Sequence, residues 1–204
     1  MNETETIARA QQGDLPAFNR LVTAYQGIAY TVAYRTMGDA EDAADVCQEA
    51  FLSAFKHIRT LRGAEFKSWL LRIVTNACYD RLRYQRRRPA SSLEEMAAAG
   101  GDEENPDHSL WLADSSAGPE EIAMSSELAD LIQIGVASLP PDQRIIAVLS
   151  DAQGFSYQEI ADITGVPLGT VKSRLSRARA RLREYLMARP ELLPTGYRLR
   201  NAEQ

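Results

Sequence analysis

The hydrophobic residues of this chain recur at every third or fourth position, a spacing that places them on one face of an α-helix. The pattern predicts helices over residues 4–12, 14–37, 40–58, 66–85 and 126–138, and then three more that end near 154, 164 and 186. Glycine or proline separates most of these segments, as is typical of helix ends. Apolar and polar residues do not alternate with a period of two over any sustained stretch, so we expect an all-α fold.

The apolar pattern fades between residues 90 and 120, where Gly, Pro, Ser and acidic residues dominate. We therefore predict two small helical domains, residues 1–89 and 121–189, joined by a flexible acidic linker over 90–120. Residues 190–204, with two prolines and a glycine, are expected to form a loose tail. The linker contains one short apolar patch, Leu110-Trp111-Leu112, which either docks on a domain or binds a partner.

The segment from Phe155 to Leu186 predicts a helix-turn-helix. Ser156 and Glu159 match a capping box that opens a short helix, and Gly165 stands where a helix C-terminus needs a left-handed residue. The longer helix after it has an apolar face of Val171, Leu175, Ala178 and Leu182, and an opposite face of Gly169, Ser173, Ser176, Arg177 and Ala180. Such a division suits a helix that packs on its domain and enters a major groove. The alternative is a basic helix that only faces solvent.

The formal net charge of −5 hides an uneven distribution. Residues 69–88 carry six arginines against one acidic residue, and residues 167–189 carry seven Lys or Arg against one. Residues 89–125 carry nine Asp or Glu and no basic residue. Because a polyanion responds to local fields rather than to net charge, the two basic stretches are candidate contacts for nucleic acid.

The first basic stretch lies on the helix predicted over 66–85, whose core stripe is Leu70, Ile73, Val74, Ala77 and Leu82. The opposite side carries Trp69, Arg72, Asn76, Asp80, Arg83 and Arg87. A single-stranded or melting nucleic acid needs a ring for stacking, an amide for base edges and cations for phosphates. In the competing interpretation, Trp69 is half in the core and the arginines merely solvate the helix.

The helix predicted over 40–58 has an apolar face of Cys47, Phe51, Ala54, Phe55 and Ile58. Another face carries what we term the acidic ridge, which consists of Asp42, Asp45, Gln48 and Glu49. Such a ridge is either a solvated surface or a docking surface for a partner.

Several classes of protein are disfavoured by what the chain lacks. Cys47 and Cys78 fall inside helical apolar patterns, which predicts two buried thiols in a reducing compartment. His57 and His108 have no zinc-ligand spacing, and no phosphate-binding loop or catalytic triad is recognisable, so we expect no metal, no cofactor and no enzyme activity. The chain shows neither signal-peptide order nor the roughly 18 apolar residues of a membrane span. We expect a cytoplasmic protein without membrane insertion.

Three blocks of the chain resemble bacterial RNA polymerase sigma factors of the small, two-domain, extracytoplasmic-function type. The stretch DAEDAADVCQEAFLSAF, residues 39–55, is similar to the family's core-binding helix. The stretch FKSWLLRIVTNACYDRLRYQRRRP, residues 66–89, resembles the helix that recognises and melts the promoter −10 element. Residues 139–186 resemble the −35-binding domain, and their run GTVKSRLSRARARLR is especially specific. The blocks keep the family's order and spacing.

The resemblance implies a protein that binds core RNA polymerase, recognises both promoter elements and promotes duplex opening. It implies that the acidic ridge docks on the β′ clamp helices, that the β flap is a further contact, and that an anti-sigma factor is a partner. Contacts to the −10 element would come from Arg62, Lys67, Trp69, Arg72, Asn76, Arg83 and Arg87, with loop 60–65 holding a flipped base. Contacts to the −35 element would come from Thr170, Lys172, Ser173, Arg174, Ser176, Arg177, Arg179 and Arg181.

Two features depart from the family pattern, and two other functions stay open. Pro167-Leu168 stands where a polar N-cap is usual, and the linker is longer than expected. A stand-alone helix-turn-helix regulator would account for residues 155–186 but not for the acidic ridge or the Trp69 helix. A sigma-like decoy that binds only a regulatory partner would have lost the basic residues of the groove-facing helix, whereas Lys172, Arg174 and Arg177 are present.

Overall fold

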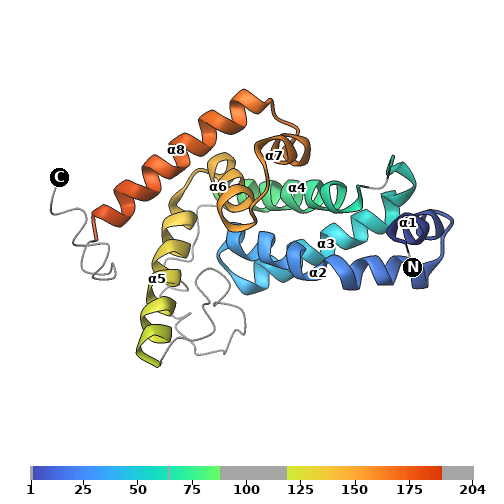
Figure 1. Cartoon of the computed structure of the whole chain (residues 1–204), viewed down its shortest axis with the longest axis horizontal. Coiled ribbons are helices and arrows are strands. Elements are labelled where there is room, and N and C mark those ends of the chain that lie inside the picture. The colour runs from blue at the N-terminus through green and yellow to red at the C-terminus, as the bar shows by residue number, and fades with distance from the viewer. Residues whose placement is uncertain (1, 64, 88–118, 190–204) are drawn as a thin grey trace.

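The computed structural model describes residues 2–63, 65–87 and 119–189, and most of these residues are helical (Figure 1). No strand occurs within these ranges. The all-α fold predicted from the hydrophobic spacing is therefore confirmed. Residues 90–118 of the predicted linker, with the Leu110-Trp111-Leu112 patch, and the predicted tail over 190–204 lie outside the described residues.

The N-terminal part of the fold consists of α1 (Glu3–Gln11), α2 (Leu15–Met37), α3 (Ala40–His57), the short 3-10 helix η1 (Ile58–Thr60) and α4 (Phe66–Arg87). The Asp14 carboxylate accepts the backbone N–H of Ala17 at 3.1 Å, and Asp39 accepts that of Asp42 at 2.8 Å. Both aspartates are thus N-caps. Gly38 ends α2 with a backbone φ of 81°, a value that residues other than glycine adopt rarely.

The C-terminal part consists of α5 (Pro119–Ser138), α6 (Pro141–Ala147), the π-helical turn η3 (Val148–Ala152), α7 (Tyr157–Thr164) and α8 (Leu168–Met187). Helix α5 begins at Pro119, earlier than the apolar spacing that starts near Ser126 indicates. Proline and the acidic residues after it suit the first turn of a helix, although they give no apolar period. Leu128 and Leu131 are buried in a small cluster with Tyr185 of α8, so α5 packs on α8.

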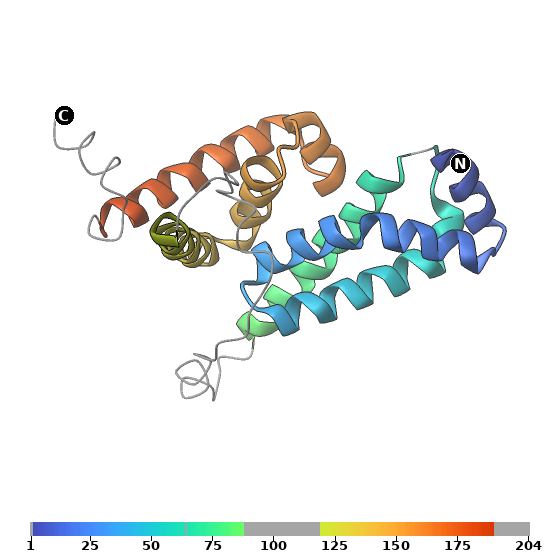
Figure 2. The same ribbon diagram turned by 60° about the horizontal axis from the view of Figure 1, so that its bottom comes forward.

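The two parts of the fold share one continuous hydrophobic core. Helix α4 packs on α2 and α3 of its own part and also lies beside α7 of the other (Figures 1 and 2). Leu71 and Thr75 of α4 are almost fully buried. The predicted core stripe of this helix omits both residues, because the apolar spacing within one helix does not show how many of its sides are covered.

Two expectations for the N-terminal helices have different outcomes. Cys47 and Cys78 are buried free thiols, as predicted. Removal from water raises the pKa of Cys47 to about 11 and that of Cys78 to about 12, so neither is a reactive thiolate at neutral pH. Phe55, which was expected on the apolar face of α3, is instead 44% exposed. It lies at the border of that face, where its ring meets Phe18 edge-on at 5.0 Å.

Candidate nucleic-acid interface

The helix-turn-helix is held by the local interactions that its sequence predicts. The backbone N–H of Ser156 donates to the Glu159 carboxylate at 2.8 Å, and the Glu159 N–H donates to Ser156 Oγ at 3.3 Å, which completes the capping box. The Ser156 hydroxyl, which donates to the same carboxylate at 2.7 Å, and the Ser156 N–H together lower the pKa of Glu159. Gly165 ends α7 with a φ of 69°, and its N–H donates to the Ala161 carbonyl. The helix α8 then starts at Leu168, with Pro167 as an N-cap that has no side-chain hydrogen bond.

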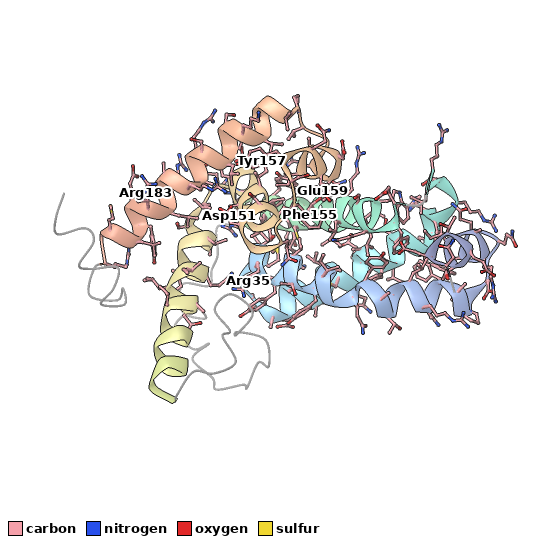
Figure 3. The ribbon with its side chains drawn as sticks, in the orientation of Figure 1. Arg35, Asp151, Phe155, Tyr157, Glu159 and Arg183 are labelled. Carbon is pink, nitrogen blue, oxygen red and sulfur yellow. The ribbon has the colours of Figure 1, made fainter. Side chains whose placement is uncertain are left out.

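The outward face of α8 is open and basic. Its inward residues Val171, Leu175 and Ala178 are buried, as predicted. Among the residues assigned to the −35 element, Lys172, Ser176, Arg177, Arg179 and Arg181 are exposed. Thr170 and Ser173 are half-buried, and the Ser173 hydroxyl donates to the Thr170 carbonyl at 3.1 Å. A shallow depression on this face is lined by residues that include Tyr157, Lys172, Ser176, Arg179 and Arg183 (Figure 3 labels Tyr157 and Arg183).

Two arginines of α8 are paired with carboxylates of their own domain. Arg179 donates from Nη2 and Nε to the carboxylate of Asp151 at 2.6 and 3.2 Å, and this bonding raises the pKa of Arg179. Arg174 Nε lies 3.2 Å from the carboxylate of Asp142. Pairing orients these guanidinium groups and leaves fewer of their N–H groups for DNA. Asp151 is separated from Arg179 by 28 positions, so no local motif in the sequence indicated its role.

The outward side of α4 carries residues of the kind that the −10 assignment requires. Asn76 and Arg83 are exposed, as is Arg62 in the loop before the helix. Trp69 is half-buried, and its ring centroid lies 5.8 Å from that of Phe66, so one part of the ring packs on the core and the rest remains accessible. Arg87 belongs to α4, but its side chain lies outside the described ones.

Two further residues assigned to the −10 element lie against the C-terminal part of the fold. Lys67 Nζ is 4.5 Å from the centroid of the Phe155 ring, a cation–π geometry. A Cβ atom built on Gly165 would lie 3.4 Å from Nη2 of Arg72, so this guanidinium group sits beside the C-terminus of α7. The structure therefore places two of the −10 candidate residues against the helix-turn-helix domain, which the sequence did not indicate.

The acidic ridge divides into one half-buried residue, Asp42, and an exposed part. The Asp42 carboxylate accepts from Arg81 Nε at 2.8 Å and from Gln85 Nε2 at 2.6 Å, so Asp42 joins α3 to α4. Asp45, Gln48 and Glu49 are exposed, and Leu52, one turn further along α3, is 55% exposed. Exposed carboxylates beside an apolar side chain form a surface suited to a protein partner. The role of Arg81 as the partner of Asp42 was not foreseen from its place in a basic run.

No three or more His, Cys, Asp or Glu side chains in the described ranges are grouped so that they can hold a metal ion. Within the same ranges, no helix combines the length and the apolar character needed to cross a membrane.

Comparison with protein families identifies a domain in each part of the fold. The family described as sigma-70 region 2 matches residues 21–88, and the family described as sigma-70, region 4 matches residues 133–182. The first match covers most of α2 together with α3 and α4. The second covers the end of α5 and most of α6 to α8, including the helix-turn-helix.

Relatives that match most of this chain are ECF RNA polymerase sigma factors by name. The ECF RNA polymerase sigma-E factor of Escherichia coli is 38% identical over 85% of this chain and 88% of that protein. The ECF RNA polymerase sigma factor SigE of Mycolicibacterium smegmatis is 36% identical over 88% of this chain, which spans 65% of that protein. The structure of the sigma factor RpoE in complex with the anti-sigma factor NepR from Bartonella quintana has a TM-score of 0.59 and 25% identity, covering 83% of this chain and 96% of that one. The chain thus belongs to the ECF family of RNA polymerase sigma factors.

Proposed function

We propose that this sigma factor binds core RNA polymerase, recognises the −35 and −10 promoter elements through α8 and α4, and promotes opening of the duplex. The observation that supports this most is the presence of two separate basic helices, one in each sigma-70 domain. Each helix has one side in the core and an outward side with hydrogen-bonding and cationic residues. A regulator that acts alone through its helix-turn-helix would need only α8.

In this proposal, α8 enters the major groove at the −35 element. Lys172, Ser176 and Arg177 are exposed on its outward face and contact base edges. A bidentate contact from arginine to guanine discriminates against other bases by about 1–3 kcal/mol. Arg181 and the paired Arg179 meet phosphates, which adds affinity that falls as the salt concentration rises.

Helix α4 acts on the −10 element as its strands separate. Asn76 and Arg83 offer an amide and a cation, and the accessible part of Trp69 offers a stacking surface. Extrusion of a base costs a few kcal/mol of stacking and pairing. Stacking of a base on an aromatic side chain is favourable by about 1–3 kcal/mol, which offsets part of that cost. Such a surface therefore shifts the equilibrium between closed and open duplex towards the separated strands. The loop before α4, with the exposed Arg62, holds the extruded base.

The acidic ridge docks on the β′ clamp helices of core polymerase. Its exposed members Asp45, Gln48 and Glu49 make the direct contacts, and Leu52 adds apolar area beside them. Asp42 contributes indirectly, because its hydrogen bonds to Arg81 and Gln85 fix α3 against the −10 helix. The helix that binds core polymerase, α3, and the helix that recognises the −10 element, α4, are thereby held in a fixed relative position.

The regulation of this chain involves an anti-sigma factor. The similar sigma factor RpoE of Bartonella quintana was solved as a complex with the anti-sigma factor NepR. The chain works in the cytoplasm, and its role is binding rather than catalysis.

Transcription reconstituted with core polymerase on a promoter library tests the proposed function. We expect initiation from promoters that share a −35 and a −10 motif at a fixed spacing. Replacement of Asp45→Lys and Glu49→Lys should abolish co-purification with core polymerase without loss of helical content. The matched control, Glu5→Lys with Glu184→Lys, reverses two exposed carboxylates elsewhere and should still bind. Tight, sequence-specific promoter binding by the chain without polymerase would instead favour a stand-alone regulator.

A further inference from the structure

The first helix, α1, lies outside the match to sigma-70 region 2, which begins at residue 21, yet it contacts the segment that leads to the −10 helix. Gln11, the last residue of α1, donates from Nε2 to the Leu61 carbonyl at 2.9 Å and to the Ile58 carbonyl at 3.2 Å. Helix α1 correspondingly lies beside η1 (Figures 1 and 2). One half-buried amide therefore joins α1 to both ends of the turn before the loop.

Both carbonyls lie where η1 ends and the loop begins. The N–H of Leu61 donates to the Ile58 carbonyl at 3.1 Å, which closes the 3-10 turn, and the backbone of Leu61 is then extended, with a φ of −62° and a ψ of 121°. The Leu61 side chain is 6% exposed, and the hydrogen bond from Gln11 to its carbonyl is partly buried. A carbonyl that loses water on folding costs free energy unless a donor replaces the water. Gln11 supplies that donor from 50 positions away in the sequence.

Helix α1 is itself fixed to α2 near both of its ends. Towards its C-terminus, Nη2 of Arg9 lies 2.6 Å from the carboxylate of Asp14, the N-cap of α2. Towards its N-terminus, the Glu3 carboxylate is hydrogen-bonded to Tyr25 of α2, and burial of the tyrosine together with this bond raises the pKa of Tyr25 to about 12. Between these points Ile7, which is 3% exposed, packs in the core. Helix α1 is thus a fixed support rather than a loose terminal segment.

The far end of the loop is held by aromatic packing. Phe66, the first residue of α4, is 0% exposed. Its ring centroid lies 5.3 Å from that of Tyr25 and 5.8 Å from that of Trp69, the stacking residue assigned to the −10 element. Because Tyr25 is also hydrogen-bonded to Glu3, α1 supports this second anchor as well as the first.

Arg62 and Gly63, which lie between the two anchors, are exposed. Gly63 has a φ of 83°, and a Cβ atom built on it would meet no atom of the described residues within 4 Å. With open space around Gly63, the conformation of these two residues depends on the segments that hold the ends of the loop. The hydrogen bonds of Gln11 hold the nearer end, one residue before Arg62.

We propose that α1 positions this loop for the extruded −10 base, and that Gln11 thereby sets how strictly one base of the −10 element is selected. The inference rests on the proposed function, in which the loop holds that base. Gln11 is a positioning residue, because it acts through backbone carbonyls and not on DNA. A loop that is held in its binding conformation loses less conformational entropy when a base enters. A loose loop can rearrange around a wrong base, as flexible binding surfaces do, so loss of the support relaxes selection.

Cleavage by trypsin after Arg62 tests whether Gln11 holds the loop. In the full chain, Gln11→Met removes the donors and keeps a side chain of similar length. We expect cleavage after Arg62, followed by mass spectrometry, to become about three- to tenfold faster, because cleavage follows the population of the locally open chain and one net hydrogen bond corresponds to a factor of this order. Gln12→Met changes an exposed neighbour of the same type and should leave the rate unchanged. An unchanged rate in folded Gln11→Met would overturn the proposal.

Two further variants separate hydrogen bonding from packing at position 11. Gln11→Glu keeps the shape of the side chain but offers only acceptors to the two carbonyls, so Arg62 should be cleaved at least as fast as in Gln11→Met. Gln11→Lys restores a donor of similar reach and should return the rate of cleavage after Arg62 towards that of the unchanged chain. Full protection of the loop in Gln11→Glu would show that packing rather than the donors holds it, which contradicts the role given to Gln11.

The functional arm measures base preference in the holoenzyme, on a promoter library randomised over the −10 element. Gln11→Met should lower the preference at one position by about three- to tenfold, the same factor as for the loop. Preference at the other −10 positions, at the −35 element and co-purification with core polymerase should not change. A uniform loss at every −10 position would mark a general loss of structure and overturn the role in selection. If the unchanged chain shows no promoter-dependent initiation, the proposed function fails and the role in selection with it, while the trypsin rates still decide whether α1 holds the loop.

Discussion

Helices α4 and α8 carry similar outward surfaces but are supported in different ways. Helix α8 is covered by its own domain, and its Arg174 and Arg179 are paired with Asp142 and Asp151 of that domain. Helix α4 is covered by its own domain and by α7 of the other. The proposed DNA-binding side of α8 is thus exposed, whereas one flank of the proposed DNA-binding side of α4 is in contact with the second domain.

The two surfaces also differ in the contacts of their cations. Lys172 and Arg177 of α8 are exposed. Lys67 and Arg72 of α4 are exposed as well, but Lys67 lies over the Phe155 ring and Arg72 lies beside Gly165, both in the C-terminal part of the fold. Of the two proposed DNA-binding surfaces, the one on α4 is therefore the one with cations in contact with the other domain.

The largest expected effect concerns the second packing surface of α4. Leu71→Ala should destabilise the chain by about 2–5 kcal/mol, as large-to-small changes in a packed core do, because Leu71 is 0% exposed. Leu175→Ala in the core of α8 should cost a similar amount. Urea unfolding of the full chain measures both, with the exposed Leu52→Ala as a control. A cost below about 0.5 kcal/mol for Leu71 would mean that this side of α4 faces solvent.

The next effect separates the two DNA-binding surfaces. Arg177→Ala should weaken transcription from promoters with the preferred −35 element by about 1–3 kcal/mol, if its guanidinium group is bidentate to guanine. Asn76→Ala should instead change the preference only at the −10 element. Transcription from a library randomised at each element in turn distinguishes the two. An equal loss on every −35 variant would assign Arg177 to a phosphate.

The smallest effect concerns the pairing that is particular to α8. The Arg179–Asp151 pair is partly exposed, so Asp151→Ala should cost less than about 1 kcal/mol of stability. The released guanidinium group of Arg179 should contact a phosphate more fully. The slope of the logarithm of the promoter-binding constant against the logarithm of the salt concentration should then become more negative by about 1, as for one additional phosphate contact. Affinity of the holoenzyme measured across a range of salt concentrations tests this, with Asp151→Asn as the conservative variant. An unchanged slope would show that the pairing does not limit Arg179.

Much of the fold could be predicted because its signals are local. Asp14, Asp39 and Ser156 cap helices through groups only three residues away, and Gly38 and Gly165 end helices by their own backbone conformation. The buried face of α8 follows from the helical period alone. Interactions of this kind act within one or two turns, so a pattern of residue types is enough to indicate them.

The sequence predicted which residues lie on the candidate interface, but it did not predict which side chains form ion pairs there. Lys172 and Arg177 lie on an open face of α8, where the helical period placed them. The bonds of Arg179 to Asp151 and of Arg81 to Asp42 join residues 28 and 39 positions apart. No period or motif links such positions, because only the path of the chain through the fold brings them together.

The sequence by itself thus determined the helices, their caps and which side of α8 meets its core. The tertiary structure alone decided that Arg144 bonds to the end of α2 and that Arg72 lies at the end of α7. A helix end exposes carbonyls whatever its surroundings, but which cation reaches them depends on how distant segments pack. The contact between α4 and α7 is for that reason a property of the packed chain and of no segment within it.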